Sequence, residues 1–290
     1  MPALRLQEPL LRVTLPEPAP LLRCPVCGLP LHRVDRAWRC EAGHCFDIAR
    51  QGYVNLLTGR AAHVGDTATM LDARAAVLAA GHLDVVTRGV IDALADDLPA
   101  GVIVEAGAGT AHHLAEVARA LPSRSGVALD ASVAAAKRAA AADRSRITSV
   151  VADVWQDWPL LDGVAAAVLS IFAPRNLSET ARVLVPGGRL VVVAPAQDHL
   201  HELRASLGLL EIEAGKQERL VAEAAPHLQF LDRTDVRTTR TVDRATARAI
   251  AAMGPSGFHL DDAVLRGRAA RLSAQTETTI AVTVTRFVRA

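Results

Sequence analysis

Four residues near the N-terminus have the types and the spacing of a zinc site. They follow the pattern Cys24-x-x-Cys27, twelve residues, Cys40, three residues, His44. Three thiolates and one imidazole complete a closed tetrahedral shell, which is typical of a structural rather than a catalytic zinc ion. Cys45 directly follows His44 and is an alternative fourth ligand. Because all four cysteines lie in this one segment, a cytosolic metal site is favoured over a disulfide framework.

A glycine-rich loop farther along the chain could hold a nucleotide-like cofactor. The loop Glu105-Ala106-Gly107-Ala108-Gly109-Thr110 follows an apolar run and opens a helix at Ala111 or His112. Glycines let the backbone pass close to a ligand, and a helix N-terminus offers unpaired amides. The third glycine of a dinucleotide-binding loop is missing, which argues against NAD.

Three carboxylates come at the ends of three successive expected strands. Glu105 opens the loop, Asp130 ends the run 126–130, and Asp153 with Val154 ends the run after it. A carboxylate placed like Asp130 can accept hydrogen bonds from both ribose hydroxyls. This pattern resembles that of S-adenosylmethionine methyltransferases, so S-adenosylmethionine is the expected cofactor. The resemblance implies that Asp153 and Val154 lie beside the adenine, and that Glu105 lies near the methionine ammonium group or orients the loop.

The segment that leaves the fourth expected strand contains an aromatic residue that could contact a substrate. Phe172 lies in Ser170-Ile171-Phe172-Ala173-Pro174-Arg175-Asn176, and methyltransferases of this class place target-base contacts at this point. Phe172 could stack on a base there, or it could be a core residue.

Short apolar runs alternate with helical stretches and would position these side chains. Helical periodicity covers 67–98, and Ala-rich helical segments lie near 112–121 and 132–142. Alternation of this kind predicts a parallel sheet covered on both faces. The expected strands are 102–104, 127–129, 150–151, 166–169, 190–193 and, at the end, a run rich in β-branched residues at 278–284.

This order predicts an α/β fold class with a small N-terminal zinc-ribbon domain. The resemblance to S-adenosylmethionine methyltransferases implies that the sheet is a Rossmann-like seven-stranded class I methyltransferase sheet. The expected divisions are a flexible arm (1–20), a zinc-binding domain (21–57), a linker with helices (58–98) and the methyltransferase domain (99–290). The zinc module is too small to fold alone, so the ion should supply much of its folding free energy.

Charge and composition restrict the partners only weakly. The 290 residues carry a formal net charge of +1, without the basic excess of many dedicated nucleic-acid binders. Nearly every cation is Arg, the side chain better suited to forked phosphate contacts, although a GC-rich genome would give the same bias. No run is long and apolar enough to span a bilayer, and no secretion signal is visible, so we expect a cytoplasmic protein without membrane contact.

The motifs together are more specific than any one of them. The zinc pattern runs into Phe46-Asp47-Ile48-Ala49-Arg50-Gln51-Gly52-Tyr53-Val54-Asn55-Leu56-Leu57, and later motifs include Gln197-Asp198-His199-Leu200 and Ala252-Met253-Gly254-Pro255-Ser256. Over residues 22–288 the chain resembles the zinc-bearing guanine-N1 methyltransferases of 23S ribosomal RNA. It is similar in particular to the members that protect antibiotic producers against tylosin-type macrolides.

The resemblance assigns roles to individual residues. Cys24, Cys27, Cys40 and His44 fall on the family's zinc ligands. Gly109 and Thr110 fall on the cofactor loop, and His199 falls on a cofactor contact after the fifth strand. The chain departs from the family at three places, since Leu83 stands where Tyr is usual near the cofactor, Glu105 where Asp is usual, and Ala111 where Gly is frequent.

Methylation of guanine N1 requires loss of a proton that N1 carries at neutral pH, so a base or a stabilised O6 anion is needed. Asp198, His199 and His112 are candidate bases by position only, and Arg175 or an amide near Pro174 could stabilise charge on O6. N1 is engaged inside a duplex, so the expected target is a 23S ribosomal RNA hairpin whose loop exposes the base.

Arginines of the zinc segment could present a cationic surface to that RNA, and a merely solvated surface is the alternative; they are Arg23, Arg33, Arg36, Arg39 and Arg50. Two other functions remain open at this point, a methyltransferase acting on small natural products and an RNA-binding protein without activity. The sequence does not decide between a monomer and a homodimer.

Overall fold

The computed structural model describes residues 20–59, 65–95 and 97–290. The predicted arm at 1–20 lies, but for its last residue, outside the described residues, as do residues 60–64 and 96 of the predicted linker with helices (58–98). Within the described residues no helix is long and apolar enough to cross a membrane.

An eight-stranded sheet forms the centre of the molecule, in the order β10-β11-β9-β8-β5-β6-β7-β4. The strands from β4 to β9 run parallel, while β11 is antiparallel to both β9 and β10. Their bounds are β4 (Tyr53–Asn55), β5 (Val102–Ala106), β6 (Gly126–Asp130), β7 (Ile147–Val151), β8 (Ala165–Ile171), β9 (Leu184–Pro195), β10 (Gln229–Asp243) and β11 (Gln275–Val288).

Seven of these strands form the expected class I methyltransferase sheet, and β4 is an addition at its edge. β4 pairs with β7 through Tyr53–Ser149, Val54–Val150 and Asn55–Val151. The apolar runs of the sequence predict neither β4 nor β10. β10 is fifteen residues long but mostly exposed and rich in Arg and Thr, so it lacks the apolar run that reveals a buried strand.

Helices cover both faces of the sheet, which explains why its central strands are mostly apolar. α2 (Asp84–Ala93) and α3 (His112–Ala120) contribute to the core on one face. α5 (Leu177–Val183) and α7 (Lys216–Ala224) contribute to the core on the other. α4 (Val133–Ala142) packs against β4, β6 and β7.

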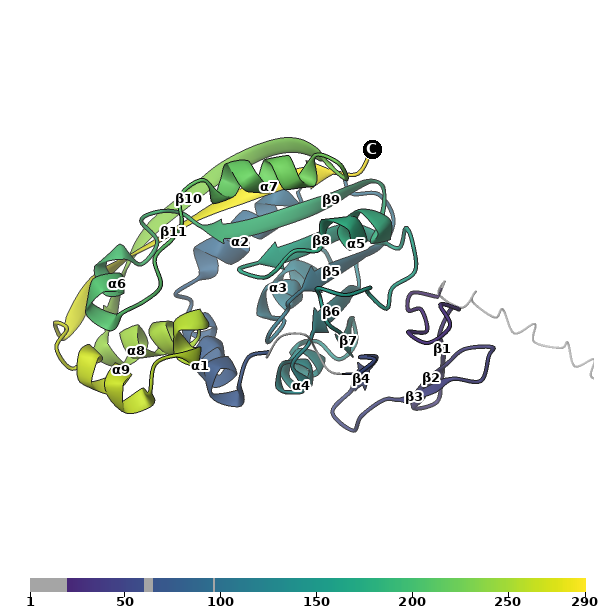
Figure 1. The fold of residues 1–290 in the computed structure, drawn as a ribbon, viewed down its shortest axis with the longest axis horizontal. Helices are drawn as coiled ribbons and strands as arrows, with labels where there is room; N and C mark the ends of the chain where they lie inside the picture. The colour runs from purple at the N-terminus through teal and green to yellow at the C-terminus, as the bar shows by residue number, and fades with distance from the viewer. Residues whose placement is uncertain (1–19, 60–64, 96) are drawn as a thin grey trace, which may run out of the picture.

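A group of helices lies at the end of the molecule opposite the N-terminal module (Figure 1). α1 (Ala68–Ala79) packs against α8 (Arg244–Ala252), and α8 packs in turn against α9 (Asp262–Ala269), α6 (His201–Leu207) and the 3₁₀ turn η1 (Pro255–Phe258). This group and the sheet edge border the large cleft described below.

The N-terminal module is a three-stranded antiparallel sheet of β1 (His32–Val34), β2 (Ala37–Arg39) and β3 (Cys45–Asp47). We call residues 21–47, which contain this sheet and its turns, the zinc ribbon. It lies beside the β7–β4 end of the main sheet (Figure 1). Leu22 and Leu31 are fully buried in the same core cluster as Trp158 and Leu160 of the main domain, so the ribbon is packed against that domain.

Candidate functional site

The four predicted zinc ligands converge in the ribbon. One ligand atom from each of Cys24, Cys27, Cys40 and His44 lies within 4.8 Å of all the others. Cys27 Sγ is 3.7 Å from Cys40 Sγ, and His44 Nδ1 is 3.6 Å from Cys24 Sγ and 3.4 Å from Cys40 Sγ. Zinc bonds of about 2.3 Å to sulfur and about 2.0 Å to nitrogen place tetrahedral ligand atoms roughly 3.5 to 3.8 Å apart. The site therefore fits a zinc ion.

The choice between His44 and Cys45 is settled by this geometry. Cys45 is exposed, begins β3 and is not part of the cluster. Burial acts to raise the pKa of the Cys40 thiol, but hydrogen bonds with the His44 side chain and backbone outweigh it and lower that pKa to about 7. A thiolate at this position is therefore accessible near neutral pH, as zinc ligation requires.

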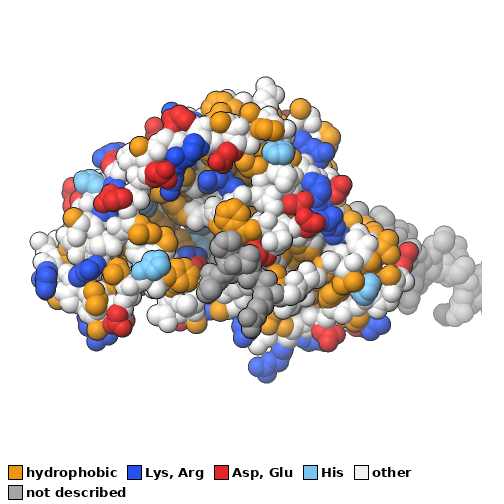
Figure 2. Space-filling view, in the orientation of Figure 1, with side chains coloured by type: hydrophobic (Ala, Val, Ile, Leu, Met, Phe, Trp, Pro, Cys, Tyr) orange, Lys and Arg blue, Asp and Glu red, His pale blue; other side chains and the backbone are white. Residues whose placement is uncertain are grey.

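A cleft of about 840 Å³ opens at the carboxyl ends of the parallel strands. Figure 2 shows apolar and basic side chains together around the hollow on this face. Its basic lining residues come from several elements and are Arg74, Arg175, Arg204, Lys216 and Arg219. Ligands of open α/β sheets bind at this edge, where strand ends and loops supply the contacts.

Most of the predicted cofactor residues lie in one part of this cleft, which we call the inner part. Glu105, Gly107, Thr110, Asp130, Asp153 and Val154 line it, and so does Leu83, which is buried. Gly109 does not line the cleft, but its amide donates a hydrogen bond of 2.8 Å to Asp130 Oδ2. The roles of these residues toward a cofactor stay predictions.

Asp130 links the glycine loop to the start of α4. Its second oxygen, Oδ1, accepts a hydrogen bond of 2.8 Å from the Ser132 amide. Burial raises the pKa of the Asp130 carboxyl, while the two amides and the Arg74 guanidinium act in the opposite direction. The carboxylate thus holds the loop in place and faces the cleft at the same time.

Glu105 is 2% exposed and lies beneath the glycine loop. Its Oε2 accepts a hydrogen bond of 3.2 Å from the Leu114 amide in α3. Burial, with a smaller contribution from Asp130, raises the pKa of this carboxyl to about 8. Glu105 is therefore mostly protonated at pH 7 in the cofactor-free protein, although the Leu114 amide and the Arg74 guanidinium act to lower its pKa.

The backbone of the glycine loop explains its composition. Gly107 has φ of +70°, and a Cβ there would lie 2.7 Å from the Cβ of Ala173. Ala111 has φ of 54°, in the left-handed region where glycine is preferred. The loop at the strand end is therefore packed tightly against the segment that follows β8.

Part of the cleft wall is formed by residues for which the sequence predicts no functional role. Arg74 in α1 forms an ion pair of 2.5 Å with Asp66 and donates a hydrogen bond of 2.7 Å to the Met253 carbonyl. The Ser256 hydroxyl accepts a hydrogen bond of 3.2 Å from the Leu210 amide. The stretch 252–256 belongs to the motifs that carry the family resemblance, which was the available signal for it.

The outer part of the cleft contains the residues after β8 and β9. Phe172 is 44% exposed, so the core alternative for this residue is wrong. The Phe172 ring centroid is 5.8 Å from that of His199, with 37° between the planes. Phe172 and Leu200 have φ of 51° and 57°, strained values that are often concentrated at functional sites.

The three candidate bases differ in what they can do. His199 Nδ1 accepts a hydrogen bond of 3.2 Å from the Ala281 amide, so a neutral ring carries its proton on Nε2. Burial lowers the pKa of His199 to about 4 and that of His112 by a smaller amount. Asp198 forms an ion pair with Arg237. At neutral pH His199 is therefore a hydrogen-bond donor through Nε2.

Family models match both parts of the chain. A model described as "RlmA, N-terminal" matches residues 22–61, and one described as "Methyltransferase domain" matches residues 103–188. These matches cover the zinc ribbon and the strands that carry the glycine loop and the three carboxylates.

Two curated proteins are similar over nearly their whole length. A "23S rRNA (guanine(748)-N(1))-methyltransferase" of Streptomyces fradiae is 45% identical, over 91% of this chain and 95% of its own. A protein of Micromonospora griseorubida, provisionally named a 23S rRNA (guanine-N(1)-)-methyltransferase, is 44% identical over 94% of this chain and 98% of its own. Among solved structures, a geranyl diphosphate C-methyltransferase from Streptomyces coelicolor A3(2) matches with a TM-score of 0.45 and 17% identity, over 70% of this chain and 75% of that one.

Proposed function

The chain belongs to the zinc-ribbon 23S rRNA (guanine-N1)-methyltransferases, and from this membership we propose that it methylates N1 of a guanine in 23S ribosomal RNA with S-adenosylmethionine as methyl donor. The observation that carries the proposal is the position of Phe172 and His199 in the same cleft as Asp130 and Asp153. A base seated on Phe172 would lie next to a cofactor held at the strand ends.

The cofactor supplies a methyl group on a cationic sulfonium, and the protein must mainly align the acceptor with it. In the inner part, Asp130 would hold the ribose, Asp153 and Val154 the adenine, and Glu105 would lie near the methionine ammonium group. In the outer part, His199 Nε2 and the Arg175 guanidinium are donors available to guanine O6, where negative charge develops as N1 loses its proton. Burial lowers the pKa of Arg175, which nevertheless stays charged at neutral pH.

Phe172 provides the first prediction. Replacing Phe172 with alanine should lower kcat/KM for the RNA by about 5-fold to 150-fold, because base–aromatic stacking contributes roughly 1–3 kcal/mol. Single-turnover methylation of a 23S rRNA hairpin measures the effect. Phe172→Trp should keep most of the activity, and both variants should bind S-adenosylhomocysteine like the wild type. An unchanged kcat/KM in the alanine variant would remove Phe172 from base recognition.

Glu105 provides a prediction about pH. Because burial holds the pKa of Glu105 at about 8 and a bound cation favours the carboxylate, cofactor binding at pH 7 should release most of one proton. Calorimetry in two buffers of different protonation enthalpy measures this proton count. Glu105→Gln removes the titrating group and should reduce the release accordingly. Equal proton counts for the two proteins would contradict the assignment.

The same carboxyl affects the stability of the cofactor-free protein. Its pKa is higher in the folded chain than the ordinary value of 4.5, so the folded state binds the proton more tightly. The resulting stabilisation is complete below pH 4.5 and is lost as the pH rises to about 8. Glu105→Gln should therefore show a flatter dependence of Tm on pH over this interval.

Reverse transcription of 23S ribosomal RNA from cells with and without the gene tests the activity directly. N1-methylguanine cannot form a Watson–Crick pair, so a new polymerase stop should appear beside the modified guanine. We place that guanine in a hairpin loop, at the position that the name of the Streptomyces fradiae relative gives as 748. Absence of any new stop would overturn the proposal and favour a small-molecule acceptor.

We further propose that this modification confers resistance to tylosin-type macrolides, and that the protein works in the cytoplasm, where ribosomes are found. Growth of a susceptible strain on tylosin, with the active gene or a variant that does not bind cofactor, tests the resistance. The homodimer left open by the sequence is tested by sedimentation with and without the RNA hairpin.

A further inference from the structure

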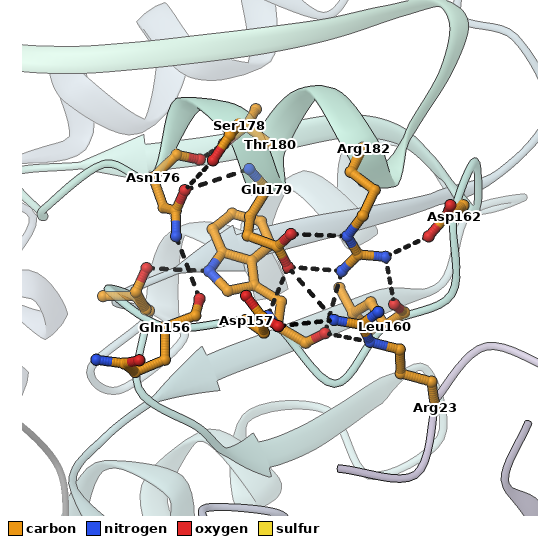
Figure 3. Close-up of polar contacts among 12 residues, drawn as sticks. Arg23, Gln156, Asp157, Leu160, Asp162, Asn176, Ser178, Glu179, Thr180 and Arg182 are labelled. Carbon is orange, nitrogen blue, oxygen red and sulfur yellow. Dashed lines mark hydrogen bonds and ion pairs between the residues drawn. The ribbon is translucent and has the colours of Figure 1, made fainter. Parts of the chain in front are cut away.

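A cluster of polar contacts joins the zinc ribbon, the segment 153–161 after β7 and helix α5. We call Arg23, Trp158, Glu179 and Arg182, with the contacts among them, the Glu179 node (Figure 3). Arg23 is 135 residues from Trp158 in the sequence, whereas Trp158, Glu179 and Arg182 lie within one stretch of the main domain. Such a cluster fixes the relative position of the segments it connects.

The ribbon enters the node through Arg23, the residue before the zinc ligand Cys24. Arg23 Nε donates a hydrogen bond of 3.1 Å to the Trp158 carbonyl, and its Nη2 lies 3.7 Å from Asp157 and 4.0 Å from Glu179. The backbone adds a bridge between Leu22 and Leu160. Arg23 is therefore engaged in the node, with 24% of its side chain exposed, whereas Arg33, Arg36, Arg39 and Arg50 are exposed.

The main domain enters the node through Glu179 in α5, which is 8% exposed. Its Oε2 accepts hydrogen bonds of 2.6 Å from the Trp158 amide and 2.6 Å from Arg182 Nη2, and its Oε1 accepts one of 2.7 Å from Arg182 Nε. Burial alone would raise the pKa of Glu179, but these donors outweigh it and lower that pKa. Glu179 is thus a buried carboxylate whose charge is compensated.

Contacts of the node and of the neighbouring residue Asn176 extend to both the inner and the outer part of the cleft. The Trp158 indole donates a hydrogen bond of 3.0 Å to the carbonyl of Val154, which lines the inner part. Asn176, the N-cap of α5, donates to the carbonyls of Trp155 and Gln156 at 3.3 and 3.2 Å. Asn176 also ends the segment 172–176, whose Phe172 and Arg175 lie in the outer part.

We propose that Arg23 and Glu179 are positioning residues. Through them, the packing of the zinc ribbon against the main domain is coupled to the binding of the cofactor adenine by segment 153–155. The proposal rests on the proposed function only in taking S-adenosylmethionine as the cofactor. Coupling between two sites is reciprocal, so cofactor binding must also hold the ribbon, and its zinc, more firmly.

Calorimetric titration of the zinc-loaded full-length protein with S-adenosylhomocysteine tests the first direction. Arg23→Met should weaken binding about 5-fold to 20-fold, within the usual range of such coupling. Arg23→Lys keeps the charge but not the forked donor, and it should restore affinity in part. The matched control is Arg119→Met, which removes an exposed arginine that pairs with Glu116 within α3, and it should bind like the wild type.

Equilibrium competition for zinc with a chromogenic chelator tests the reverse direction on the wild type itself. Saturating S-adenosylhomocysteine should tighten zinc binding at least 3-fold, and this gain should be lost in Arg23→Met. An equal zinc affinity with and without S-adenosylhomocysteine in the wild type would overturn the proposal, even if the variant fails to fold. So would wild-type affinity in a folded Arg23→Met. Neither assay contains RNA, so failure of the methylation assay and failure of the coupling are separate results.

Discussion

Replacing Asp130 with alanine should weaken S-adenosylhomocysteine binding by about 100-fold or more. The carboxylate is predicted to accept two ribose hydroxyls, and hydrogen bonds to a charged group contribute about 1.5–3 kcal/mol each. The substitution also frees the Gly109 amide that Asp130 holds at 2.8 Å, so the loop loses an anchor. Calorimetry gives the affinity, and methylation at saturating RNA should fall in parallel.

Asp143 offers a matched control for this substitution. Its carboxylate also accepts two backbone amides, those of Ser145 and Arg146, both at 3.1 Å, but it lies outside the cleft lining. Asp143→Ala should therefore lower Tm without changing the affinity for S-adenosylhomocysteine. If Asp130→Ala binds within tenfold of the wild type, the ribose is held by other groups and the predicted cofactor site is wrong.

Removal of zinc should abolish RNA methylation while leaving the main sheet folded. Structural zinc contributes on the order of 10–16 kcal/mol to the folding of small zinc modules, and the ribbon has little core of its own. The main sheet keeps apolar cores on both faces. Amide hydrogen exchange after chelation should show lost protection in residues 21–47 and retained protection in β5, β6, β8 and β9.

Cysteine variants separate the effect of the ion from the effect of the chelator. Cys24→Ser should lose zinc and activity together. Cys45→Ser changes a cysteine outside the cluster, so it should retain one zinc per chain and full activity. Loss of zinc from Cys45→Ser, or methylation by the zinc-free wild type, would contradict the structural role assigned to His44 and the ion.

The sequence predicts those parts of the fold in which a short local pattern is compatible with only one kind of structure. Buried parallel strands need continuous apolar runs, and the runs at 102–104, 127–129 and 166–169 lie within β5, β6 and β8. The zinc spacing is equally direct, because the turns that present the ligands are short. β10 is not predicted from the sequence, because an exposed strand buries too little apolar surface to require a continuous apolar run.

The parts of the site that stayed hidden depend on contacts between distant segments. Arg74 meets Met253 across 179 positions, and Arg23 meets Trp158 across 135. Neither arginine differs in type or neighbourhood from those that remain at the surface, so composition could not distinguish them. Likewise, His199 could be placed after the fifth strand, but its tautomer depends on the Ala281 amide contributed by β11.

The short strand β4 limits where the chain can be cut. Because Tyr53–Asn55 hydrogen-bond along β7, a truncated protein that begins at residue 58 or 99 would expose the backbone groups of β7 at a bare sheet edge. Such edges recruit strands from other molecules. Fragments intended to isolate the catalytic half should therefore retain residues from about Gln51 onward, and shorter ones should be recovered mainly as aggregates.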